Sequence, residues 1–171
     1  MANLTPNHDS FSHTPLERPD SQIRLRELLP TVRQPPGTTT NHFDQPIYCK
    51  LQTVSLSSQP AYKALSYAWG PEDQERSDIY IKEAALSITI SLDVALKHLR
   101  HKQETSLLIW IDQICIMQQN YPERDAQVRI MARIYSGAEQ VLVWLGAAGQ
   151  DSDDLMDSTS ASVPLWTPPA S

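Results

Sequence analysis

Two apolar runs in the second half of the chain bracket a helical pattern. Residues 107–111 (LLIWI) form the first run, and residues 141–145 (VLVWL) form the second. Continuous apolar runs of this length are typical of strands that are buried on both faces of a sheet. Between them, apolar side chains recur at helical spacing and predict a helix over residues 123–137. The order of strand, helix and strand predicts parallel strands and therefore an α/β core.

Weaker patterns precede this unit. Residues 47–54 alternate imperfectly between apolar and polar side chains, which predicts a half-exposed strand. Residues 79–81 and 86–90 predict a short antiparallel strand pair around a turn. Ser91 is a suitable N-cap for a helix that carries apolar residues at helical spacing. Those residues are Leu92, Ala95, Leu96 and Leu99.

Proline marks the edges of the predicted domain. Of the 13 prolines, only Pro71 and Pro122 fall between residues 61 and 150. Residues 1–21 are polar and interrupted by proline, and residues 151–171 are rich in Ser, Thr and Pro, so we expect a disordered leader and a disordered tail. The 171-residue chain then has one domain, over residues 22–150.

Charge and composition exclude several classes of partner. With 14 basic and 20 acidic residues the chain has a formal charge of −6, which argues against nucleic acid and anionic membranes as partners. The longest apolar window is shorter than the roughly 20 residues that a membrane-spanning helix needs. Two cysteines give no zinc-binding spacing, and five glycines form no phosphate-binding motif, so we expect neither a metal nor a bound cofactor. The amino-terminal residues lack a signal-peptide pattern, which indicates a cytoplasmic protein.

Polar side chains follow two of the predicted core strands. Asp112 comes directly after the first apolar run, and Cys115 lies in the loop beyond it. Another core strand is predicted at residues 64–67, before a turn at Gly70. Ligands bind open parallel sheets at the carboxyl ends of strands, so the two loops are expected to form one site. The second loop contributes the candidate ligand-binding residues Ser66, Tyr67, Trp69 and Gly70.

The residues of the first loop have structural alternatives. Asp112 is a candidate catalytic base if burial raises its pKa, and it is also suited to capping a loop through its carboxylate. Cys115 is a candidate ligand contact or nucleophile, or a small core residue among apolar neighbours. Glu123 is interpreted as a charge at the start of a helix, with no further role.

The second loop leaves the same choice open. Trp69 could stack on a flat ligand ring or fill the core. Ser66 and Tyr67 could hydrogen-bond a ligand, because Gly70 allows a close approach to the backbone. These readings make the second loop the better candidate for ligand contacts.

Six blocks of the sequence resemble the fungal heterokaryon-incompatibility domain in their order and spacing. The blocks are IRLRELLP (23–30), YKALSYAWG (62–70), KHLR (97–100), IWIDQICIMQ (109–118), ERDAQVRIMARIYSGA (123–138) and VLVWLG (141–146). Met117 stands where the family usually has Asn. A family domain also continues with further elements after the last block, so the resemblance implies a domain that is incomplete at its C-terminal end.

The resemblance implies a fungal protein of non-self recognition and programmed cell death, a form of innate immunity. On this view the chain is a signalling module that acts through self-association or a protein partner. The family is similar to Toll/interleukin-1 receptor (TIR) domains, which implies a flavodoxin-like parallel sheet with flanking helices.

Some TIR domains cleave NAD, so a second implication is a hydrolase for which NAD is a substrate at the Tyr67, Trp69 and Asp112 rim. The catalytic glutamate of those domains follows the third strand, and this chain has no glutamate after Glu139. A non-functional truncated fragment is the third alternative.

Overall fold

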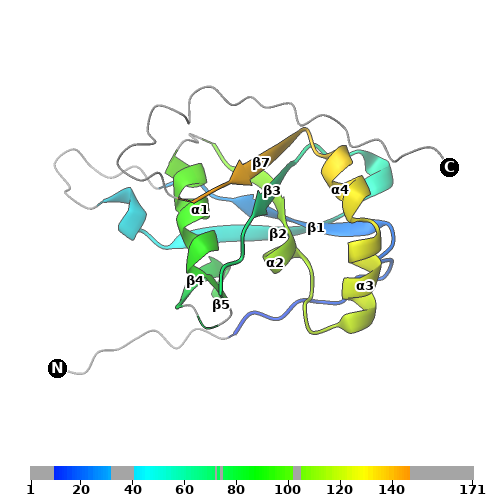
Figure 1. Ribbon diagram of the computed structural model, residues 1–171, viewed down its shortest axis with the longest axis horizontal. Coiled ribbons are helices and arrows are strands. Elements are labelled where there is room, and N and C mark those ends of the chain that lie inside the picture. The colour runs from blue at the N-terminus through cyan, green and yellow to red at the C-terminus, as the bar shows by residue number, and fades with distance from the viewer. Residues whose placement is uncertain (1–9, 32–40, 72, 74, 102–104, 147–171) are drawn as a thin grey trace.

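The computed structural model describes residues 10–31, 41–71, 73, 75–101 and 105–146 of the chain. Its strands form one seven-stranded sheet in the order β5-β4-β2-β1-β6-β3-β7 (Figure 1). The strands are β1 (Gln22–Leu28), β2 (Ile47–Ser55), β3 (Lys63–Tyr67), β4 (Arg76–Ile81), β5 (Ala84–Thr89), β6 (Leu107–Ile111) and β7 (Gln140–Trp144). The helices are η1 (His42–Asp44), η2 (Leu56–Ser58), α1 (Ile90–His101), α2 (Asp112–Cys115), α3 (Tyr121–Arg129) and α4 (Met131–Gly137). The chain is therefore an α/β protein.

Three parallel strands carry the predicted strand–helix–strand unit. β3 lies between β6 and β7 and pairs in parallel with each, so the two apolar runs are parallel strands of one sheet, as predicted. They are not neighbours, because the strand predicted at residues 64–67 lies between them. Helix α4 packs here through Tyr135, whose ring lies 5.3 Å from that of Trp110 on β6.

The sheet is mixed. The expectation of a parallel sheet holds for β6, β3 and β7, but it is wrong for the sheet as a whole. β1 runs antiparallel to both of its neighbours, β2 and β6. The antiparallel pair expected near residues 79–90 is confirmed as β4 and β5, with Lys82 in the left-handed region (φ 57°) at the turn. It joins the same sheet because β4 pairs with β2. Beyond the three parallel strands, the order of the sheet was not evident from local patterns.

Two helix boundaries differ from the prediction. The helix expected at 123–137 is two helices, α3 and α4, which meet at Ile130 (φ −97°, ψ 5°). Helix α1 begins at Ile90, so its cap is Thr89, whose Oγ1 accepts from the Leu92 N–H at 3.3 Å. Ser91, the expected cap, instead donates its hydroxyl to the carbonyl of Ala68 at 3.0 Å.

Part of the expected disordered leader is packed. We call residues 10–16 the N-terminal strap. The Phe11 N–H donates to the Ala85 carbonyl at the edge of β5 (2.8 Å), and the Leu16 N–H donates to Glu123 of α3 (2.8 Å). These contacts join the strap to the rest of the chain, whereas the sequence analysis expected a disordered leader over residues 1–21. No local pattern indicates them, because their partners lie far away in the sequence. Residues 1–9 and the expected tail, 151–171, lie outside the described residues.

The hydrophobic core lies along the sheet beneath the helices. Its most buried side chains, each at 0% exposure, include Ile23, Leu25, Ala64, Ile79, Ile88, Leu92, Ile109, Trp110, Ile111 and Ile134. Most of these positions belong to the apolar patterns noted in the sequence. Within the described part of the chain, none of the helices has the length and apolar character to cross a membrane.

Candidate functional site

The carboxyl ends of β3 and β6 meet at one rim of the sheet, where the sequence analysis expected the loops after these strands to lie together. The Trp69 indole N–H donates to Asp112 Oδ2 at 3.0 Å, and the Tyr67 hydroxyl donates to Gln113 Oε1 at 2.9 Å. The contacts form because β3 and β6 are adjacent and parallel, which places both loops at the same edge of the sheet. The structure therefore brings together Tyr67, Trp69 and Asp112.

Asp112 is the first residue of α2, and both of its carboxylate oxygens are engaged. Oδ1 accepts from the Gln113 N–H at 2.7 Å, and Oδ2 accepts from Trp69. Burial raises the pKa of Asp112 above its ordinary value, while the bonds from Gln113 and Trp69 oppose that rise. The arrangement fits a carboxylate that orders the loop. The raised pKa also fits the alternative interpretation of Asp112 as a catalytic base.

Gln113 of α2 connects three elements at this rim. Its Oε1 lies within hydrogen-bonding distance of the Tyr67 hydroxyl and of Thr89 Oγ1, at 3.3 Å. Burial, followed by the nearby Asp112 charge, raises the pKa of Tyr67, so this phenol is a hydrogen-bond donor. The only local signal for Gln113 was its place directly after Asp112.

Ser66 and Cys115 do not join this rim. Ser66 lies on the opposite face of β3 from Tyr67, because side chains alternate along a strand, and it lies beside Tyr135, whose hydroxyl donates to the Leu65 carbonyl at 3.4 Å. Cys115 is fully buried at 0% exposure, and its Sγ accepts from the Ile111 N–H at 3.4 Å. Burial raises the pKa of the Cys115 thiol to about 11, which disfavours the nucleophilic thiolate. The packing interpretation of Cys115 fits these contacts.

A cavity of about 560 Å³ opens beside the rim. Trp69 and Gly70 line it, and Gly70 has a positive φ of 79° that a side chain would strain. The remaining walls come from the N-terminal strap, the β4–β5 hairpin and the loop between α2 and α3. These walls include Ser10, Phe11, Ser12, His13, Arg76, Ser87, Thr89, Gln113, Met117, Gln118 and Gln119.

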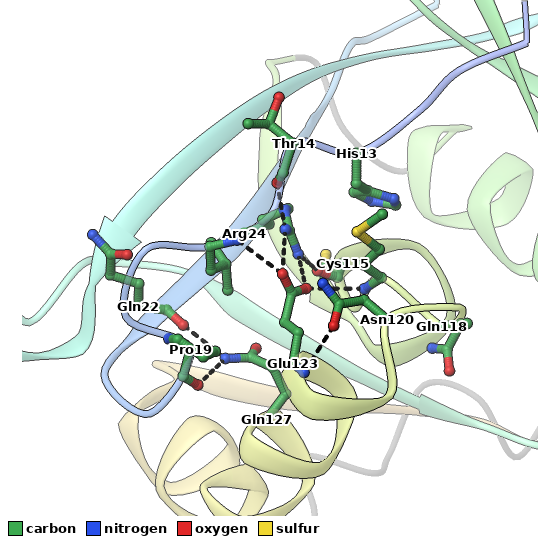
Figure 2. A network of polar contacts seen from close by, with 12 residues as sticks. His13, Thr14, Pro19, Gln22, Arg24, Cys115, Gln118, Asn120, Glu123 and Gln127 are labelled. Atoms are coloured by element: carbon green, nitrogen blue, oxygen red, sulfur yellow. Dashed lines mark hydrogen bonds and ion pairs between the residues drawn. The ribbon is translucent and has the colours of Figure 1, made fainter.

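A buried ion pair holds the strap and the α2–α3 loop together (Figure 2). Arg24 of β1 donates from Nη1 and Nη2 to the two carboxylate oxygens of Glu123, at 2.6 and 2.9 Å. The same carboxylate accepts the N–H groups of Leu16 and Met117. Burial opposes ionisation, but the hydrogen bonds from Arg24 and Leu16 outweigh it, so the pKa of Glu123 lies below its ordinary value.

Glu123 lies in the first turn of α3, as expected, but the interpretation that it has no further role is wrong. Its side chain is 3% exposed, and that of Arg24 is 1% exposed. Asn120, the N-cap of α3, accepts from the Glu123 N–H at 3.2 Å. An Asn followed three residues later by Glu is a known signature of a helix start. This signature concerns neighbours along the chain and could not reveal a partner 99 residues away.

A second arginine of β1 lies behind the strap. Arg26 is fully buried, and its Nε donates to the carbonyl of Ile114 at 3.1 Å. His13 Nε2 lies 3.0 Å from that carbonyl and 3.0 Å from Arg26 Nη2. Burial, then the charge of Arg26, lowers the pKa of His13 to about 4, so the ring is neutral at pH 7.

Comparison with known proteins identifies the family. The model of the family described as "Heterokaryon incompatibility protein (HET)" matches residues 62–168. The chain is 38% identical over 160 residues to "Heterokaryon incompatibility protein 6, OR allele" of Neurospora crassa. That match covers 87% of this chain but 22% of the relative, so the chain spans about a fifth of the relative's length. No solved structure matches. The chain therefore belongs to the heterokaryon incompatibility family.

Proposed function

We propose that this chain is a cytoplasmic signalling domain of fungal non-self recognition, which triggers cell death through self-association or a protein partner. The observation that carries the proposal is the 38% identity to an incompatibility protein over 87% of the chain. The TIR-like, flavodoxin-type relationship is part of this proposal. The three adjacent parallel strands support it, whereas the antiparallel β1 is a departure from it.

The edge of the sheet at β7 supports an association surface. β7 is the last strand in the sheet order and pairs with β3, so within the described residues its other edge has no neighbouring strand. Val143 on this strand is 56% exposed, and Leu145 just beyond it is 90% exposed. An uncovered strand edge with exposed apolar side chains is suited to pairing with another chain.

A matched pair of substitutions tests this function. Val128 on α3 is 53% exposed, so Val128→Glu adds the same charge as Val143→Glu at a similarly exposed valine away from β7. We expect the expressed chain to arrest fungal growth and to self-associate in sedimentation experiments. Val143→Glu should abolish both effects, and Val128→Glu should abolish neither. A chain that stays monomeric at all concentrations and leaves growth unaffected would contradict the proposal.

NAD cleavage is a second candidate function, and one observation favours it. Asp112 has a raised pKa and lies at a rim beside a cavity of about 560 Å³ that Trp69 lines. A raised carboxyl pKa suits a general base. Incubation with NAD, scored by nicotinamide release, tests this candidate. Release that Asp112→Asn abolishes at unchanged stability would support it, and the absence of release would remove it.

A further inference from the structure

We infer that the cavity beside Trp69 binds a small anionic ligand that carries a flat ring. This inference goes beyond the association proposed for β7. It concerns the same cavity as the NAD candidate but does not depend on cleavage, because its test measures the binding of simple probes. The described residues that line the cavity include no aspartate or glutamate, and Arg76 is the charged side chain among them. The other polar groups on the walls are hydroxyls, amides, the Trp69 indole and the neutral ring of His13.

Arg76 is positioned as an anchor for an anion. It is the first residue of β4 and is exposed to solvent. Ser87 of β5 holds its guanidinium, accepting from Nε at 2.9 Å through Oγ and from Nη2 at 3.0 Å through the carbonyl. No ion pair joins Arg76 to a carboxylate within the described ranges. A planar guanidinium held on one side suits a carboxylate or phosphate on the other.

A second positive charge lies behind the cavity wall. Phe11 and His13 of the strap line the cavity, and the Arg26 guanidinium lies 5.0 Å from the centre of the Phe11 ring. Arg26 is fully buried, and among the described residues its Nη1 has no hydrogen-bond partner. A buried charge of this kind is unfavourable unless an opposite charge is near. An anion in the cavity would supply that charge across the thickness of the strap.

Two carboxylates behind the cavity wall are already engaged. Glu123 is paired with Arg24, and the two oxygens of Asp112 accept from Gln113 and Trp69. Asp112 still opposes an anion to some degree, since its charge lies at the rim. In the described part of the chain no ion pair joins Arg26 or Arg76 to a carboxylate, so both guanidinium charges remain available to an anion.

Trp69 provides the surface for a ring. The side chain is 39% exposed, and its hydrogen bond to Asp112 fixes the orientation of the indole. An exposed indole with a fixed plane favours stacking with a flat group. Gln118 on the neighbouring wall donates its amide to the Asp112 carbonyl at 2.9 Å, which holds the wall against the same loop.

The indole N–H of Trp69 gives a direct readout. Its signal in a proton–nitrogen NMR spectrum, assigned with Trp69→Phe, is followed while benzoate, phenyl phosphate or benzyl alcohol is added. Benzoate and phenyl phosphate distinguish a carboxylate from a phosphate ligand, and benzyl alcohol has the ring without the charge. We expect a saturable shift with at least one of the two anions, and binding of benzyl alcohol at least about tenfold weaker.

Two variants that each remove one arginine charge distinguish binding at this cavity from a general effect of net charge. Arg76→Gln should weaken anion binding at least about tenfold, because it removes a charge-assisted contact. Arg129→Gln makes the same change at an exposed position on α3 and should leave binding unchanged. The other indole signals report whether Arg76→Gln remains folded. Equal binding of benzyl alcohol and the anions, an Arg76→Gln variant that binds as well as the original chain, or no saturable shift would overturn the inference.

Discussion

Replacing Glu123 with Gln tests the ion pair that ties the N-terminal strap to the sheet. The carboxylate accepts two hydrogen bonds from Arg24 and one each from the N–H groups of Leu16 and Met117. Gln has nearly the same shape, but it offers one acceptor oxygen and turns an NH₂ group towards these donors. The change therefore leaves the buried charge of Arg24 without its counter-charge.

The expected loss of stability follows from that unpaired charge. Removing one partner of a buried ion pair lowers the free energy of unfolding by about 3–5 kcal/mol. Because Gln keeps the volume and one acceptor, we expect about 3 kcal/mol for Glu123→Gln. This is a large part of the roughly 5–15 kcal/mol that stabilises a typical domain.

Urea unfolding followed by circular dichroism measures the change. Glu17→Gln is the matched control, because Glu17 follows the strap and is exposed, and we expect a change within about 0.5 kcal/mol there. A loss below about 1 kcal/mol for Glu123→Gln would refute the reasoning, since it would mean that Arg24 is not a buried charge dependent on this carboxylate.

The same variant should change the dependence of stability on pH. The pKa of Glu123 is lowered from its ordinary value of 4.5 in the folded chain. The ionised carboxylate therefore stabilises the fold fully above that ordinary value, and the stabilisation is lost as the pH falls through the folded-state pKa. The difference in unfolding free energy between the original chain and Glu123→Gln should shrink below about pH 4.5. A difference that stayed constant down to pH 2 would contradict this.

Three further measurements test other parts of the structure. Thr89→Ala removes the cap of α1 and should lower the unfolding free energy by about 0.5–2 kcal/mol. Thr89→Ser keeps the capping hydroxyl and should retain most of that stability. Asp112→Asn keeps one of two acceptor oxygens and should cost about 0.5–2 kcal/mol, and no change would argue against a loop-ordering role. Cys49 and Cys115 are buried, and burial raises the pKa of their thiols to about 12 and about 11, so both should resist a thiol reagent at pH 8 until urea unfolds the chain.

Much of the candidate site could be predicted from the sequence, because its loops follow recognisable strands. Asp112 follows an apolar run, and Trp69 follows a second strand, so the rule for parallel sheets was enough to bring them together. Ser66 does not contact Asp112 or Trp69, because a one-residue step along a strand puts a side chain on the other face. The hydrogen-bond partners of Gln113 and His13 could not be predicted, since they come from separate elements of the sheet and from the loop after β6.

The sequence by itself determined the features that depend on neighbours along the chain. These were the parallel runs at β6 and β7, the β4–β5 hairpin and the family resemblance, because apolar periodicity and turn residues act over a few positions. Only the tertiary structure decided the role of β1. Its pattern of apolar side chains with Arg24 and Arg26 looks like that of a half-exposed strand, yet both arginines are buried. Their acceptors are Glu123 and the Ile114 carbonyl, 99 and 88 residues away, and a charge is buried only where the fold brings such acceptors to it.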